Sequence, residues 1–191
     1  VYQQGGTATI GAINFATLDW PRAVVDSEGQ EADELRALTA GATPTAINLL
    51  FVQDFTETGT LGIAAGIPGP NGVPGTAASA VMISVDTHLD GDGATLLTDL
   101  MGETMAHEVG HQLGLFHTSE SDGTEHDPIS DTLECDAERD ADGDGEVSAE
   151  ECEAAGGRNF MFWTAAETFG QFEMSPTQAA ILRDSVIARP Q

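Results

Sequence analysis

The string HEVGHQLGLFH carries residue types whose spacing suits a metal ion. His107 and His111 are four residues apart, so on a helix both imidazoles would project from one face toward the same ion. Gly114 would let the chain leave the helix, and His117 could then turn back as a third ligand. Glu108 lies next to that face, where its carboxylate could hold a water. Three neutral nitrogens leave one coordination position open, which is typical of a catalytic zinc site.

Residues 140–151, DADGDGEVSAEE, match the loop pattern of EF-hand calcium sites, and Gly145 would make its sharp turn. The expected ligands are Asp140, Asp142, Asp144, the carbonyl of Glu146, Ser148 through a water, and Glu151 with both oxygens. The alternative is a solvated acidic loop in a chain already rich in aspartate. A second acidic string, with Asp86, Asp90 and Asp92, lacks the later ligands and is a weaker candidate.

The two cysteines, Cys135 and Cys152, flank this acidic loop. They do not form the CxxC spacing that zinc or redox sites use. We therefore expect one disulfide in an exported protein. The alternative is a pair of free thiols in a cytosolic chain.

The charge balance narrows the class of partner. The chain has 32 Asp and Glu against six cations, for a formal net charge of −26. A surface this negative repels phosphate, which argues against nucleic acid and anionic membranes. It favours divalent cations, basic peptides and high-salt surroundings. No apolar stretch approaches the ~20 residues that a membrane span needs.

Hydrophobic spacing predicts the elements that must position these groups. At 191 residues the chain is about one domain long. Strands are expected at 7–19, 46–55 and 80–86, helices at 31–40, 95–113 and 175–188, and an irregular Gly/Pro-rich loop at 59–76. Residues 118–160 are polar with little periodicity, so we expect them to be held by something other than a core. The prediction is one α/β domain in two lobes, 1–117 and 118–191.

The zinc string matches H-E-x-x-H-x-x-G-x-x-H at every fixed position and resembles the signature of the metzincin clan of zinc peptidases. That clan has a methionine turn beneath the metal, and Asn159–Met161 resembles it. Within the clan the sequence looks most similar to the pappalysin branch. That branch often has an Asp-Thr pair, two cysteines and an Asn-x-Met turn in this order, and Asp131-Thr132, Cys135, Cys152 and Asn159–Met161 follow it.

The resemblance implies a zincin-like fold: a twisted mixed sheet, backing and active-site helices, and a smaller irregular C-terminal lobe. A peptide substrate would lie across the cleft and pair with an edge strand, for which residues 62–67 and 80–85 are both candidates. Related enzymes often carry a tyrosine two residues after the turn methionine. Trp163 occupies that place here, and the only tyrosine of the chain is Tyr2. An indole N–H can donate a hydrogen bond but cannot ligate zinc.

The sequence therefore predicts a secreted, monomeric zinc endopeptidase with structural calcium, acting on peptide or protein substrates. Glu108 would be the general base. Trp163 and either Glu167 or Glu173 could line a pocket for basic side chains. The alternative is a calcium-ordered extracellular binding module with a vestigial or structural zinc site. The retained Glu108 speaks against that alternative, because a structural site needs no base.

Overall fold

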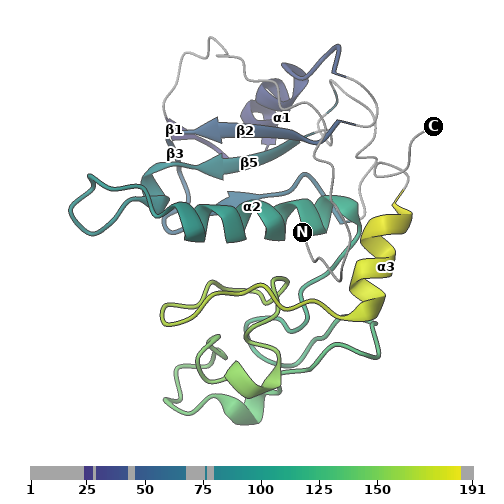
Figure 1. Cartoon of the computed structure of the whole chain (residues 1–191). Coiled ribbons are helices and arrows are strands. Elements are labelled where there is room, and N and C mark those ends of the chain that lie inside the picture. The colour runs from purple at the N-terminus through teal and green to yellow at the C-terminus, as the bar shows by residue number, and fades with distance from the viewer. Residues whose placement is uncertain (1–23, 28, 43–45, 68–75, 77–79, 186–191) are drawn as a thin grey trace.

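The computed structural model describes residues 24–27, 29–42, 46–67, 76 and 80–185, so the strand expected at 7–19 lies outside the described residues. An upper lobe of sheet and helices stands above an irregular lower lobe (Figure 1). The described elements are β1 (Val24–Val25), α1 (Gly29–Ala37), β2 (Asn48–Val52), β3 (Asp54–Phe55), β4 (Gly62–Ile63), β5 (Ala80–Ser84), η1 (Asp86–His88), α2 (Thr98–Leu113), η2 (Ala137–Arg139), η3 (Glu153–Ala155) and α3 (Pro176–Asp184). No helix in these ranges is long and apolar enough to cross a bilayer.

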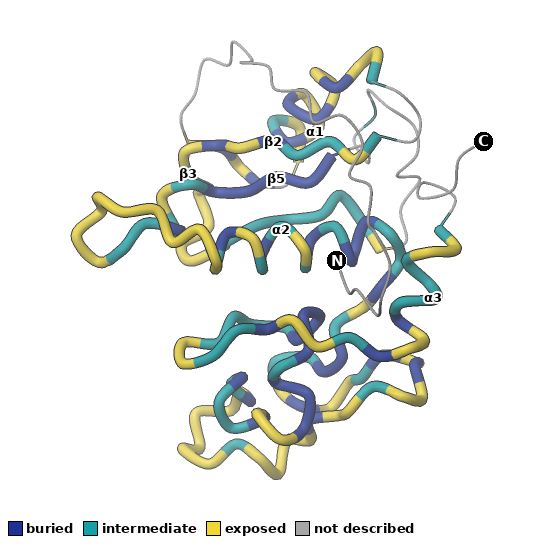
Figure 2. The backbone as a smooth tube through the Cα atoms, in the orientation of Figure 1, coloured by how far each residue is buried: buried dark blue, intermediate teal, exposed yellow. Residues whose placement is uncertain are grey.

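The main sheet has the strand order β2-β5-β4. β2 runs parallel to β5, with Leu50 opposite Met82, and β4 runs antiparallel to β5 on its other side. All five residues of β5 are buried, because the strand is central and covered on both faces (Figure 2). β1 and β3 form a separate parallel pair. The mixed sheet confirms the predicted α/β class, and it leaves β4 at an edge of the sheet.

The sheet lies between two helices, because alternate residues of β5 face opposite sides. Ala80 and Met82 pack with Ala32 and Leu35 of α1. Val81 and Ile83 face the other way and pack with Met101 of α2. The helix that carries the zinc string is thereby fixed against the sheet along its length (Figure 1).

α2 begins three residues later than predicted. The chain before it is occupied by a tight loop, in which Asp90 Oδ1 accepts the N–H groups of Ala94 and Thr95, and Leu96 pairs with Leu89. The helix ends as predicted, at Gly114, whose φ of 112° is left-handed. The weak acidic string at Asp90 therefore caps a turn.

The prediction that residues 118–160 lack a core is wrong. This part of the lower lobe contains buried residues (Figure 2) and contributes to two small apolar clusters. Their buried members are Cys135, Val147, Ala149, Cys152, Ala155 and Phe162 in one, and Leu115, Ile129, Phe160 and Met161 in the other. These residues are spaced without a period, so they gave no helix or strand signal. The predicted disulfide is confirmed, since Cys135 and Cys152 are bonded.

α3 anchors the turn at Asn159–Met161. The hydroxyl of Ser175 accepts the N–H of Gln178, and the Gln178 side chain accepts the N–H of Ser175, which completes a capping box. The same Gln178 oxygen accepts from Asn159 Nδ2 at 2.9 Å. Asp131 caps the helix as well, by accepting from Ser175 Oγ and from the N–H of Thr177.

Candidate active site

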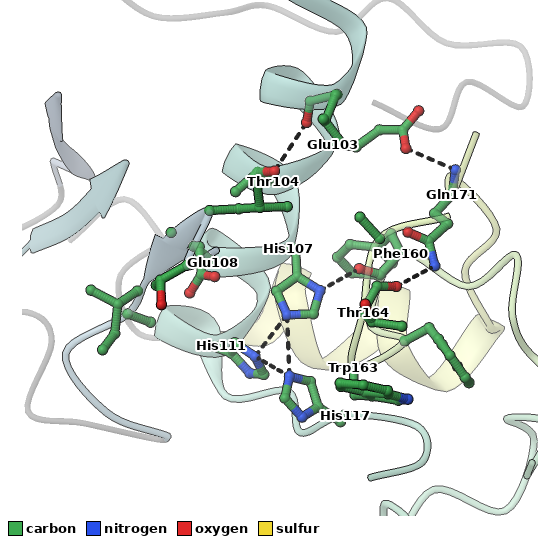
Figure 3. Close-up of a pocket in the computed structure, with 18 of the residues that line it drawn as sticks. Glu103, Thr104, His107, Glu108, His111, His117, Phe160, Trp163, Thr164 and Gln171 are labelled. Carbon is green, nitrogen blue, oxygen red and sulfur yellow. Dashed lines mark hydrogen bonds between the residues drawn. The ribbon is translucent and has the colours of Figure 1, made fainter. Parts of the chain in front are cut away.

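Three imidazole nitrogens converge at the seam between the lobes (Figure 3). The Nε2 atom of His111 lies 3.0 Å from those of His107 and His117, and the latter two are 3.2 Å apart. Three nitrogens held about 2.0–2.1 Å from one tetrahedral zinc ion would be separated by nearly these distances. His107 and His111 come from α2, and His117 comes from the chain just beyond Gly114.

The Nδ1 atom of each ring, on the side away from the three Nε2 atoms, has an oxygen as its hydrogen-bond partner. His107 Nδ1 donates to Phe160 O at 2.8 Å and His111 Nδ1 donates to Leu115 O at 2.8 Å. His117 Nδ1 lies 3.0 Å from Glu120 Oε2. With each proton on Nδ1, the three Nε2 atoms direct lone pairs at one another and have no hydrogen to share. Such an arrangement requires a cation, so the residues present fit a zinc ion.

Burial keeps the first two rings neutral, which is the form that binds metal. It lowers the pKa of His107 to about 3 and that of His111 to about 4, and for His107 the neighbouring rings add to the effect. The outer oxygen partners fix which nitrogen faces the ion. Glu120 was missed in the sequence analysis, although a carboxylate three residues after the last histidine is a usable signal.

Glu108 lies in the same cavity, and its carboxylate accepts a hydrogen bond from the backbone of Ala64. Burial raises the pKa of Glu108 to about 7, against the lowering effect of that bond. A base whose pKa is near neutrality matches the task of taking a proton from water and later returning it. A zinc ion beside it would favour the ionised form.

Two glycines allow the backbone to approach α2 closely. A Cβ at Gly110 would overlap the Sδ atom of Met161, which is fully buried beneath the helix. A Cβ at Gly62 would come within 2.8 Å of Glu108 Cγ, so β4 can pass over the helix only without a side chain there. Thr118 N donates to Met161 O at 2.9 Å, which ties the turn to the chain after the third histidine.

A cavity of about 470 Å³ opens beside these groups. One side is β4 with its flanking residues, and another is the face of α2 from Leu100 to His111. The opposite wall comes from the lower lobe, and its lining residues are Phe160, Phe162, Trp163, Thr164, Ala165 and Gln171. The cavity is therefore built from both lobes around the histidines.

Of the residues predicted to line the substrate pocket, one lies at the cavity and two do not. Trp163 lines the cavity, but its indole N–H donates to Val147 O at 2.7 Å and is not free for a substrate oxygen. Glu167 and Glu173 are exposed and do not line the cavity. Glu173 instead pairs through its backbone with the chain at Arg158 and Phe160. Among the described residues, the carboxylates that line the cavity are Glu108 and Glu103, both on α2, and the sequence analysis missed Glu103.

The acidic loop folds around its own carboxylates. Asp140 accepts the N–H groups of Gly143 and Gly145, and Gly145 has a φ of 94°, as the expected sharp turn requires. Asp140, Asp142 and Asp144 lie together with oxygens within 4.8 Å of one another. Glu151 is outside that group. Its two oxygens accept the N–H groups of Ala141 and Ser148, at 2.6 and 2.8 Å.

Comparison with known proteins agrees with this geometry. Residues 22–118, just over half of the chain, match the family model described as metallo-peptidase family M12B, reprolysin-like. That range contains the sheet, α2 and all three histidines. Neither the search of curated proteins nor that of solved structures finds a match. The chain belongs to the reprolysin-like metallopeptidases of family M12B, and is a zinc-dependent peptidase of the metzincin type.

Proposed function

We propose that this metallopeptidase is a secreted endopeptidase in which Glu108 is the general base. The observation that carries the proposal is the set of three Nε2 atoms, 3.0–3.2 Å apart, in one cavity with a buried carboxylate. When bound, zinc supplies Lewis acidity at the scissile carbonyl and acidifies a water. Glu108 accepts the proton of the attacking water and delivers it to the leaving amine.

The substrate is proposed to lie along β4. Among the described strands it pairs only with β5, on one side, and the residues around it, from Gly59 to Ala64, line the cavity. An extended peptide can add to such an edge through backbone hydrogen bonds. Of the two candidates of the sequence analysis, β5 is central in the described sheet and β4 lies at its edge, so β4 is the candidate that can pair with a substrate.

Glu103 gives the pocket a preference for cationic side chains in this proposal. Glu103 and Glu108 are the only carboxylates that line the cavity in the described part of the chain, and Glu108 has the catalytic role. Glu103 Oε2 accepts the N–H of Gln171 at 3.0 Å, which holds the carboxylate at the wall. A net charge of −26 would also attract basic peptides. Glu103→Gln should weaken cleavage next to Arg or Lys more than cleavage next to Leu.

We propose that the part of the chain beyond the M12B match resembles the pappalysin branch of the metzincin clan. The residues that carry it all follow residue 118, beyond the family match. Their contacts support the proposal: Asp131 caps α3, Thr132 donates to Asp127 at 2.7 Å, and Cys135 is bonded to Cys152. The disulfide also supports an extracellular location, because such bonds persist in oxidising compartments.

Calcium is proposed as a structural ion of the lower lobe. The three aspartates at 140, 142 and 144 concentrate charge in a loop with the EF-hand spacing and a left-handed Gly145. An ion there would relieve their mutual repulsion. It would order the segment that joins His117 to the turn at Met161.

The test is cleavage of a quenched peptide library by the wild type. We expect cleavage to stop in a zinc chelator and to return when zinc is added back. His117→Ala should lower the zinc content itself, measured by elemental analysis. A protein that binds stoichiometric zinc and cleaves no peptide would favour the alternative, a binding module with a vestigial zinc site.

A further inference from the structure

The wall of the cavity opposite α2 is an irregular segment. Residues 163–171 contain no helix or strand, and Trp163, Thr164, Ala165 and Gln171 of this segment line the cavity. Without a regular hydrogen-bond ladder, the position of the wall depends on contacts made by individual side chains. These contacts come from two directions.

The inner support is Gln171, which is buried. Its Nε2 donates to Thr164 O at 2.9 Å and to Gly157 O at 2.8 Å, and its Oε1 accepts the N–H of Ala166 at 3.1 Å. These bonds close the segment into a loop. The backbone N–H of Gln171 donates to Glu103, which ties one end of the loop to the active-site helix (Figure 3).

The outer support is Glu150, a half-buried residue of the acidic loop. Its Oε1 atom accepts three hydrogen bonds from the wall: from Glu167 N at 2.7 Å, Thr168 N at 3.0 Å and Thr168 Oγ1 at 3.2 Å. Hydrogen bonds to an ionised carboxylate are about twice as strong as neutral ones. Burial alone would raise the pKa of Glu150, but these bonds outweigh it and the pKa is lowered.

Neighbouring glutamates of the acidic loop face different ways. Glu151 turns into the loop, where it accepts from Ala141 and Ser148. Glu150 turns outward to the wall and is not one of the loop's expected ion ligands. Close by, Val147 O accepts the indole N–H of Trp163. The acidic loop therefore contacts the wall through the Glu150 carboxylate and the Val147 carbonyl, and neither group is an expected ion ligand.

We propose that Glu150 is a positioning residue for the substrate pocket, setting the place of the wall through Glu167 and Thr168. This inference rests on the proposed peptidase function and concerns how a substrate side chain is held. Loss of the Glu150 acceptor would free the outer end of the loop, while the histidines and Glu108 keep their own supports. KM and side-chain selectivity should change, and kcat should not.

The experiment measures kcat and KM on peptides that differ only in the side chain after the scissile bond. We expect Glu150→Ala to raise KM roughly tenfold for large side chains, the scale expected for losing hydrogen bonds to a charged group. Glu150→Gln keeps an acceptor oxygen in place, so most of the rise in KM seen in the alanine variant should be absent. Glu150→Asp keeps the charge but withdraws the acceptor, so it should behave like the alanine variant.

Glu138→Ala is the matched control, because Glu138 is an exposed glutamate of the same lobe. It should leave KM unchanged. Equal losses in the Gln and Ala variants, with Asp normal, would show that charge alone matters and would overturn the proposal, as would a fall in kcat at constant KM. If Glu150→Ala does not fold, the Gln and Asp pair decides. A wild type that cleaves nothing would refute the proposed function instead.

Discussion

The two lobes hold their residues in place by different means. In the upper lobe, β5 is buried along its whole length and helices cover both faces of the sheet, so periodic packing fixes α2. In the lower lobe, a disulfide, two small apolar clusters and side chains bonded to backbone do this work. The catalytic groups use both. The comparison teaches that the helix carrying His107, His111 and Glu108 is held by regular packing, whereas the cavity wall of the lower lobe is held by contacts of individual side chains.

The largest effect should come from the chemical group on the upper lobe. Glu108→Gln preserves shape and the bond from Ala64 but removes the base, so turnover should fall by roughly 10²–10⁴-fold. Zinc content and the melting curve should match those of the wild type, because α2 keeps its packing. Peptide hydrolysis and elemental analysis check this. Turnover at the wild-type rate would show that another group takes the proton.

Removing the disulfide should destabilise only the lower lobe. The Cys135→Ala/Cys152→Ala variant should lose about 2–5 kcal/mol of unfolding free energy, as loss of a native disulfide typically does. Denaturant unfolding measures the loss, and hydrogen exchange locates it. Exchange in β2 and β5 should stay slow while residues 120–160 open. Uniform loss of protection across both lobes would mean that the two do not differ in the way described.

Removing Glu151, the proposed bidentate calcium ligand, should have the next effect. An ion at 100 times its dissociation constant adds ~2.7 kcal/mol, so Glu151→Ala should lower Tm in calcium buffer by about 5–10 °C. A calcium-selective chelator should do the same to the wild type. Zinc content should be unchanged in both. Identical melting curves with and without calcium would leave the loop as a charged surface turn.

The smallest effect should come from the contact that joins the lobes. Gly110→Ala places a methyl group against Met161 Sδ, and such overpacking costs about 1–3 kcal/mol. Pairing it with Met161→Ala, which makes room, should make the double variant more stable than the sum of the two single losses predicts. Thermal denaturation of the four proteins completes this cycle. Strict additivity would contradict the contact.

The sequence predicted β2, β5, α2 and the group of three histidines from local signals, namely short apolar runs and i, i+4 spacing. The apolar run at 80–86 and the i, i+4 histidines translate directly into a buried strand and one helix face. The cores of the lower lobe were missed since residues such as Ile129 and Phe162 have no regular spacing. Glu103 lines the cavity where Glu167 and Glu173 do not, and it was missed because it precedes the zinc string on α2 and only the tertiary fold brings it to the cavity.

His107 and His111 lie on a helix, whereas His117 lies in the irregular chain after it, and this difference has a consequence for zinc binding. His107 and His111 can bind an ion as a bidentate pair once α2 has formed, whereas His117 lies on the chain that leads into the lower lobe. Its effective concentration at the ion is set by how well that lobe is seated, so the chelate effect and lobe order are thermodynamically linked. Zinc affinity therefore depends on how completely the lower lobe is folded, and zinc binding in turn stabilises that lobe.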